Sequence, residues 1–207
     1  MVKHNLLAVV SQRVDRVQSR GELRDALDQD LVRWLIEVGL LVMPVPNLLY
    51  SKGKLDEYLD SINPQAIVLS GGNDIGVYED RDKTEFALLK YAESKDLPVL
   101  GICRGMQVLS VYGGQKLIKV VGHTGTKHIL NREKSELEVP SEVNSYHDWA
   151  VENCPSDYEV LALTDDGVLE AIRHLSRSWE GWMWHPEREQ IFSPVCIKRA
   201  RKLFALD

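Results

Sequence analysis

The chain has 207 residues, of which 44% are hydrophobic and 27% are charged, and its formal net charge at pH 7 is −6. This length and composition fit one globular domain, residues 1–207, with a core of its own. The negative charge argues against non-specific nucleic-acid binding as the main task.

The sequence also predicts that the protein has no membrane-spanning segment, no signal peptide and no disulfide framework. No stretch approaches the roughly 20 apolar residues that span a bilayer. The first residues lack the cleavage region of a signal peptide, so we expect a cytoplasmic location. The three cysteines, Cys103, Cys154 and Cys196, are too few and too scattered for a disulfide framework or a zinc cluster.

In the first half of the chain, short apolar runs alternate with segments of helical periodicity. This alternation predicts an α/β fold with a doubly wound, mainly parallel central sheet and flanking helices. Gly39 is expected to close the first helix. The expected strands cover 6–10, 40–43, 66–69 and 97–102. The expected helices cover 23–38, 55–59, 84–94 and 104–112.

From residue 113 onward the pattern changes to short β-like pieces separated by turns. We expect mixed or antiparallel strands here, which extend the sheet and form a wall of the site. These strands cover 116–121, 136–139, 158–163, 169–173 and 181–187, and a last helix covers 194–206.

The stretch Gly101-Ile102-Cys103-Arg104-Gly105 joins an apolar run to a helix. A strand, a sharp turn and a helix are the pattern of a nucleophile elbow, here with Cys in place of Ser. Glycine tolerates the strained backbone of such a turn, and a helix N-terminus favours the reactive thiolate of a cysteine. A buried structural cysteine is the alternative, but the two flanking glycines favour a nucleophile.

A cysteine nucleophile needs a base, and His185 stands out among six histidines because Glu187 lies two positions on. In an extended strand, residues i and i+2 point to the same side, so the carboxylate is expected to orient the imidazole. A surface His/Glu pair at a strand end is the alternative. Combined with the elbow cysteine, the pair predicts a triad of Cys103, His185 and Glu187.

Gly71 and Gly72 follow the expected strand 66–69. Their backbone N–H groups can approach a ligand closely, and with the N–H of Arg104 they would form an oxyanion hole. An ordinary glycine turn is the alternative, and this segment alone is weak evidence.

Four separated motifs together resemble those of the class I glutamine amidotransferase-like hydrolases. The nearest branch is the γ-glutamyl hydrolases, which include γ-glutamyl-γ-aminobutyrate hydrolase. The resemblance extends from about residue 66 to residue 187. The motifs are Gly-Ile-Cys-Arg-Gly-Met-Gln at 101–107, Ser-Gly-Gly-Asn-Asp at 70–74, Val-Asn-Ser-Tyr-His at 143–147 and Trp-His-Pro-Glu at 184–187.

The resemblance implies a flavodoxin-like fold and a catalytic triad of Cys103, His185 and Glu187. It implies an oxyanion hole formed by Gly72 and Arg104. It also implies a reaction in which the thiolate attacks a γ-carbonyl, the histidine protonates the departing amine, and water hydrolyses a γ-glutamyl thioester.

Further residues are assigned to the glutamyl group by the same resemblance. Gln107 and the backbone of Asn144, Ser145 and Tyr146 are expected to hold its α-amino and α-carboxylate ends. His147 follows this segment and is expected to contact the substrate.

Two further features concern the branch of the family. Arg81, Asp82 and Glu85 match a segment of the γ-glutamyl hydrolases, and we expect them to be structural. Met183-Trp184 departs from the Gln-Phe of many relatives, which would reshape the pocket wall without affecting the triad.

Four arginines follow the first strand of this acidic chain, and they bear on the leaving group. Arg13 could reach a leaving group from the carboxyl end of that strand, and arginine suits phosphate. Hydrolases of γ-glutamyl-CDP-amidate offer a precedent for a phosphorylated leaving group. The alternative is a solvated helix face on which Arg13, Arg16, Arg20 and Arg24 pair with Glu22, Asp25 and Asp28.

The remaining histidines indicate neither a metal site nor a cofactor site. His123 and His128 lie five apart, and no carboxylate or cysteine has zinc-ligand spacing to them, so we expect loop or pocket-wall histidines.

Three kinds of function stay open at this point. The first is a free-standing hydrolase of a small γ-glutamyl substrate. The second is a glutaminase component that delivers ammonia to a synthase partner. The third is a non-catalytic binding domain, against which the intact triad argues. A homodimer is also left open.

Overall fold

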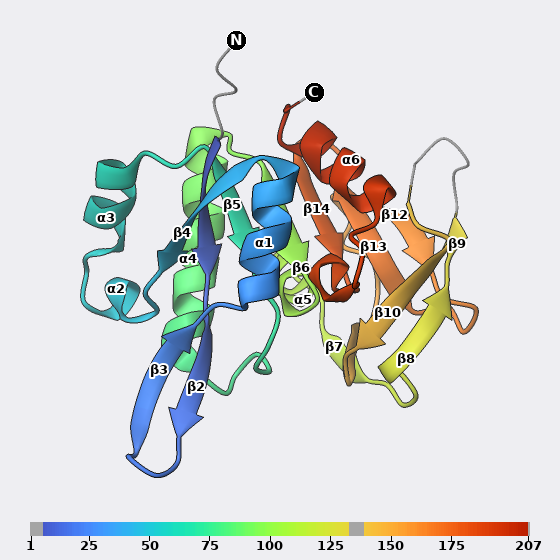
Figure 1. The fold of residues 1–207 in the computed structure, drawn as a ribbon, viewed down its shortest axis with the longest axis horizontal. Helices are drawn as coiled ribbons and strands as arrows, with labels where there is room; N and C mark the ends of the chain where they lie inside the picture. Colours follow the sequence, from blue (N-terminus) through green and yellow to red (C-terminus); the bar gives the residue numbers. More distant parts are fainter. Residues whose placement is uncertain (1–5, 133–138, 207) are drawn as a thin grey trace.

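The computed structural model describes residues 6–132 and 139–206 and contains an eight-stranded sheet (Figure 1). Five neighbouring strands are parallel and the remaining three antiparallel. The predicted parallel α/β sheet with an antiparallel extension is therefore confirmed. In sheet order the strands are β4 (Leu40–Val45), β1 (Leu6–Ser11), β5 (Ala66–Leu69), β6 (Val99–Ile102), β14 (Trp179–Trp182), β13 (Leu169–His174), β12 (Tyr158–Leu163) and β9 (Asn131–Arg132).

Helices cover both faces of the sheet. They are α1 (Gln29–Val38), α2 (Leu48–Ser51), α3 (Leu55–Ile62), α4 (Glu79–Lys95), α5 (Arg104–Tyr112) and α6 (Pro194–Leu203). Helices α1 and α6 pack on one face and α3, α4 and α5 on the other (Figure 1). Successive residues of β1 serve the two cores, since Val10 packs with the first group and Val9 with the second. Burial on both faces explains why these strands are continuous apolar runs.

Helix α1 starts later than its sequence predicts. Residues 13–26 form an antiparallel hairpin, β2 (Arg13–Val17) and β3 (Glu22–Ala26), so the expected helix start at residue 23 is wrong. The helix begins after Asp28, whose side chain accepts a hydrogen bond from the Asp30 N–H at 2.9 Å. It ends at Gly39, whose φ of 106° closes it as expected. Leu23 fits the helical spacing by chance, since its side chain lies exposed on the hairpin.

The second half adds two short ribbons beside the main sheet. Strand β7 (Leu117–Lys119) pairs with β11 (Trp149–Val151), and β8 (Thr124–Ile129) pairs with β10 (Glu142–Tyr146). The expected strands 116–121, 158–163 and 169–173 correspond to β7, β12 and β13. The expected strand 136–139 lies almost entirely outside the described residues.

The segment after β14 is not the extended strand that was predicted over 181–187. Strand β14 ends at Trp182, and residues 186–188 form a single 3₁₀ turn, η1 (Pro186–Arg188). The proline at the start of this turn cannot donate to a strand ladder and has a φ suited to a turn. The last helix likewise ends at Leu203, before the expected residue 206.

The loops that follow β1, β5, β6 and β14 all leave the sheet at the carboxyl ends of its parallel strands. In α/β sheets, ligands bind at this edge. The hairpin of β2 and β3 extends from the same edge (Figure 1). None of the described helices is long and apolar enough to cross a membrane.

Candidate active site

Cys103 occupies a strained turn between β6 and α5. Its φ of 51° and ψ of −106° lie in a region that residues other than glycine rarely adopt. Packing leaves no room for side chains on either side: a Cβ on Gly101 would lie 2.5 Å from the Gly105 carbonyl carbon, and one on Gly105 would overlap the Leu69 carbonyl oxygen. The Cys103 N–H donates to the Trp182 carbonyl at 2.7 Å, which ties the turn to β14. This is the geometry of a nucleophile elbow.

His185 lies between Cys103 and Glu187. Its Nδ1 is 2.7 Å from the Glu187 Oε1, and both side chains are buried. Burial by itself disfavours the imidazolium, but hydrogen bonds to Cys103 and Glu187, with the charges of both, outweigh it and raise the pKa of His185 to about 9. Because Nδ1 faces the carboxylate, Nε2 is the nitrogen left for the thiol. The 3₁₀ turn, not an extended strand, brings the histidine and the carboxylate together.

The side chain of Asn144 holds the backbone of His185. Its Oδ1 accepts from the His185 N–H at 2.9 Å, and its Nδ2 donates to the His185 carbonyl at 2.8 Å. The same Nδ2 is 2.7 Å from the Glu189 Oε1. Sequence reasoning assigned only the backbone of Asn144, because no local pattern links residue 144 to residue 185.

The glycine loop after β5 faces His185. A Cβ on Gly71 would lie 2.7 Å from the His185 Cε1, so only glycine fits there. The guanidinium of Arg81 lies behind the loop and donates to the carbonyl oxygens of Ser70 at 2.9 Å, Gly71 at 3.0 Å and Gly72. A trans peptide directs its carbonyl and N–H to opposite sides. The Gly71 carbonyl and the Gly72 N–H belong to the same peptide group. Because Arg81 binds that carbonyl, the Gly72 N–H points away from Arg81.

Arg81 belongs to a buried ion network that joins α4 to α5. It pairs with Glu85 at 3.2 Å, and Arg104 pairs with Glu85 and Asp82. Burial opposes the charge of Glu85, but Arg81 and Arg104 outweigh it and lower the pKa of that carboxyl. Burial lowers the pKa of Arg81 to about 10, which leaves it charged at neutral pH. The side chain of Arg104 is thus committed to the network, and only its backbone N–H, at the start of α5, is available to a ligand.

The candidate glutamyl-binding residues differ in their burial and in the groups that they contact. Gln107 is buried and donates to the Trp149 carbonyl at 2.9 Å. Ser145 is buried and donates to the His123 carbonyl. Tyr146 is half-exposed, with its ring centroid 5.9 Å from that of His185. His147 is buried deeper in the wall.

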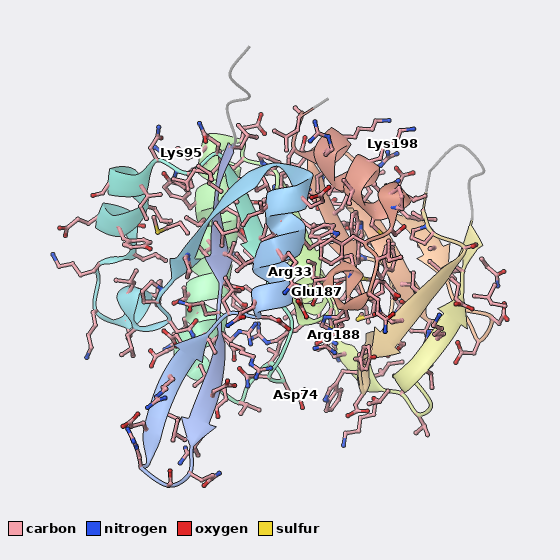
Figure 2. The ribbon with its side chains drawn as sticks, in the orientation of Figure 1. Arg33, Asp74, Lys95, Glu187, Arg188 and Lys198 are labelled. Atoms are coloured by element: carbon pink, nitrogen blue, oxygen red, sulfur yellow. The ribbon has the colours of Figure 1, made fainter. Side chains whose placement is uncertain are left out.

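A cleft of about 30 Å³ opens beside His185 and is lined by Arg13, Gly72, Glu187 and Arg188 among others. The Arg13 stem packs on Gly72, where a Cβ would lie 3.1 Å from the Arg13 Cδ, and its head pairs with Asp15 at 3.0 Å. Figure 2 shows Glu187 and Arg188 close together near the N-terminal end of α1. Arg188 also lies 4.6 Å over the Tyr146 ring. Sequence reasoning did not single out Arg188.

The three other arginines that follow β1 are Arg16, Arg20 and Arg24. They lie on the hairpin of β2 and β3 and not on a helix face. Arg24 and Arg20 reach Glu22 at 2.6 Å and 4.0 Å. Arg16 is exposed on β2. Asp25 instead accepts from Asn47.

The family model of class I glutamine amidotransferases matches residues 22–191. The chain belongs to this family. Its relatives include a γ-glutamyl-CDP-amidate hydrolase of Campylobacter jejuni, 31% identical over segments that cover 64% of this chain and 67% of the relative. They also include a component of the glutamine-hydrolysing GMP synthase of Methanococcus maripaludis, 32% identical over 73% of this chain and 80% of the relative.

A solved structure supports the fold of this chain. A protein of Thermoplasma acidophilum, described as a candidate GMP synthase component, superposes with a TM-score of 0.73 at 24% identity. The superposition covers 98% of this chain and 94% of the other. The two chains therefore share one fold over nearly their whole length.

Proposed function

We propose that this amidotransferase homologue is a cysteine-dependent hydrolase of a γ-glutamyl amide. It would release glutamate and an amine or amidate through a γ-glutamyl thioester. The observation that carries the proposal is the elbow cysteine, hydrogen-bonded to a histidine that a buried carboxylate orients at 2.7 Å. That set of groups is the one that nucleophilic acyl transfer requires.

The first half-reaction forms the thioester. His185 takes the thiol proton, and its raised pKa favours the resulting imidazolium. The Cys103 sulfur then attacks the γ-carbonyl carbon, and the carbon–nitrogen bond breaks as the imidazolium protonates the departing nitrogen. In the second half-reaction His185 takes a proton from water, which attacks the thioester and releases glutamate and the thiol.

Two backbone donors would stabilise the negative oxygen of each tetrahedral intermediate. These are the N–H groups of Gly72 and Arg104. What supports their role is the Arg81 guanidinium, which binds the carbonyl side of the glycine loop, and the place of Arg104 at the N-terminus of α5.

For the leaving group, we propose an anionic and phosphorylated one. Arg13 and Arg188 both line the cleft beside His185, and paired guanidinium groups suit phosphate oxygens. The Campylobacter relative is named for a nucleotide amidate, which agrees with this charge pattern.

The test is a substrate panel on the purified chain, with released glutamate as the readout. The panel holds glutamine, γ-glutamyl-γ-aminobutyrate and a γ-glutamyl nucleotide amidate, and Cys103→Ala is the control. We expect Cys103-dependent turnover of the nucleotide amidate above glutamine, with KM raised by at least about tenfold in Arg13→Ala through loss of a charge-assisted contact. Unchanged KM in that variant would remove the argument for a phosphorylated substrate.

The glutaminase component of a synthase is the second candidate, and the GMP synthase relatives favour it. An anthranilate synthase component 2 of Cyanophora paradoxa, 28% identical over 79% of this chain, points the same way. Turnover of glutamine alone, rising when a synthase partner is added, would decide for this candidate.

A further inference from the structure

Three histidines and one glutamate meet in the wall behind the candidate glutamyl-binding segment. They are His123, His128, His147 and Glu170, and one nitrogen or oxygen from each lies within 4.8 Å of all the others. Only His128 is not fully buried. The spacing in the sequence gave no sign of this cluster, because His123 and His128 lie at β8, whereas His147 directly follows β10 and Glu170 lies on β13.

His147 presents an unshared electron pair to a carboxylate. Its Nδ1 is 3.0 Å from the Trp149 carbonyl oxygen, which can only accept, so Nδ1 carries the proton. In the neutral ring, Nε2 is then an acceptor, yet it lies 3.3 Å from the Glu170 Oε1. Two acceptors then face each other, and either a proton or a metal ion between them would resolve the contact.

A hydrogen bond also fixes which ring nitrogen of His123 carries the proton. Its Nε2 is 3.1 Å from the Asp166 Oδ2, which fixes the proton on Nε2 when the ring is neutral. Its Nδ1 is buried and has no hydrogen-bond partner among the residues that the structure describes. The Glu170 Oε2 is buried and unpartnered in the same part of the chain.

His128 completes the group. Its Nδ1 is 3.0 Å from the Glu170 Oε1, and its Nε2 is 3.3 Å from the Thr126 hydroxyl. Each imidazole therefore has one nitrogen toward the cluster and the other on a carboxylate, a carbonyl or a hydroxyl. Outer partners of this kind orient histidines that bind metals.

A proton alone does not satisfy this arrangement. Protonating His147 would explain its contact with Glu170 but would leave the Nδ1 of His123 buried without a partner among the described residues. A divalent ion accepts electron pairs from all three rings and the carboxylate at once.

We propose that His123, His128, His147 and Glu170 bind a divalent transition-metal ion of the zinc class. Three nitrogens and one oxygen fill a tetrahedral shell, so the ion would be structural and closed to substrate. It would hold the substrate wall in place, because Gln107 and His147 both contact the Trp149 carbonyl and Ser145 donates to the His123 carbonyl. This assignment departs from the metal-free site that the sequence predicts, and it does not rest on the proposed reaction.

The test uses the Cys103→Ala chain without any affinity tag, so that neither the elbow thiol nor a tag binds metal. After incubation with Zn²⁺ and gel filtration, we expect about one ion per chain and none after the same treatment with Mg²⁺, which prefers oxygen ligands. Co²⁺ in place of Zn²⁺ should give the intense visible absorption of a tetrahedral ion. Uptake well below one Zn²⁺ per chain, or weak octahedral Co²⁺ absorption, would overturn the proposal.

Variants then locate the ion. Glu170→Gln and His147→Gln should weaken Zn²⁺ binding at least about a hundredfold in a competition titration with a chromophoric chelator, since each removes a ligand. His174→Gln is the matched control, because His174 lies on the same strand as Glu170 but outside the cluster, and it should bind as tightly as the parent. Equal affinity in all variants would place the ion elsewhere and contradict the assignment.

Discussion

Cys103 holds a backbone conformation that only its surroundings make tenable. Its φ of 51° costs on the order of 1–3 kcal/mol for a residue other than glycine. The Trp182 carbonyl and the close packing of Gly101 and Gly105 keep it there. Strain held at one residue, beside a histidine with an altered pKa, is typical of a functional site.

The Glu187 carboxylate is one of the two groups that raise the pKa of His185 to about 9. In Glu187→Gln that pKa should fall toward its ordinary value, because the hydrogen bond loses its charge. We expect kcat/KM to fall at least about tenfold and the alkaline limb of its pH profile to move to lower pH. A profile with an unmoved alkaline limb would contradict the role given to Glu187.

Gly71 tests the contact between the glycine loop and the base. In Gly71→Ala the new methyl group would lie 2.7 Å from the His185 Cε1 and must displace the ring. A misplaced base costs rate more than affinity, so we expect kcat to fall on the order of a hundredfold with a smaller change in KM. Gly76→Ala is the control, since a Cβ on Gly76 would meet nothing within 4 Å; its kcat should be retained, at some cost in stability.

At the scale of elements, the network of Arg81, Glu85 and Arg104 joins the loop after β5 to α4 and α5. It orients the glycine loop from behind and fixes the start of the elbow helix. The site therefore depends on the packing of one helix, α4, that contributes no group to the reaction we propose.

Removing the charge of Glu85 should leave two buried guanidinium groups facing each other. We expect Glu85→Gln to lower the free energy of unfolding by about 3–5 kcal/mol, seen as a lower urea midpoint at an unchanged m-value. The exposed pair of Glu79 and Lys83 on the same helix is the matched comparison. Glu79→Gln should leave the midpoint unchanged, and an equal loss in both variants would refute the argument.

For the whole molecule, two buried charges should set the pH range of stability. The pKa of Glu85 is below its ordinary 4.5, so its stabilising contribution is present above about pH 4.5 and is lost as the pH falls further. The pKa of His185 is above its ordinary 6.5, so its contribution is complete below about pH 6.5 and is lost as the pH rises through about 9.

We therefore expect the melting temperature to be highest between about pH 5 and 6.5 and to fall on both sides. Thermal melts across this range are the measurement. In Glu187→Gln the fall on the alkaline side should become shallower, because less of the His185 pKa shift is left to lose. A parent chain whose melting temperature keeps rising from pH 6.5 to 9 would show that another group controls the alkaline side.

Much of this protein is determined by local sequence. The apolar runs predict the parallel strands because burial on both faces demands such runs, and the flanking glycines predict the turn at Cys103 because no other residue fits there. His185 and Glu187 are close in sequence, so their pairing needs only one turn of chain.

Other features arise only when distant segments pack together. The hairpin of residues 13–26 takes the first four residues of the helix expected over 23–38, because β pairing overrides a spacing that Leu23 matches by chance. Asn144 meets His185, and Glu170 meets three histidines, across separations that no local pattern encodes. Sequence alone therefore determined the parallel strands, the elbow turn and the pairing of His185 with Glu187. Tertiary structure decided what holds them and what lies behind the substrate wall, since hydrogen bonds and ligand sets depend on distances in space.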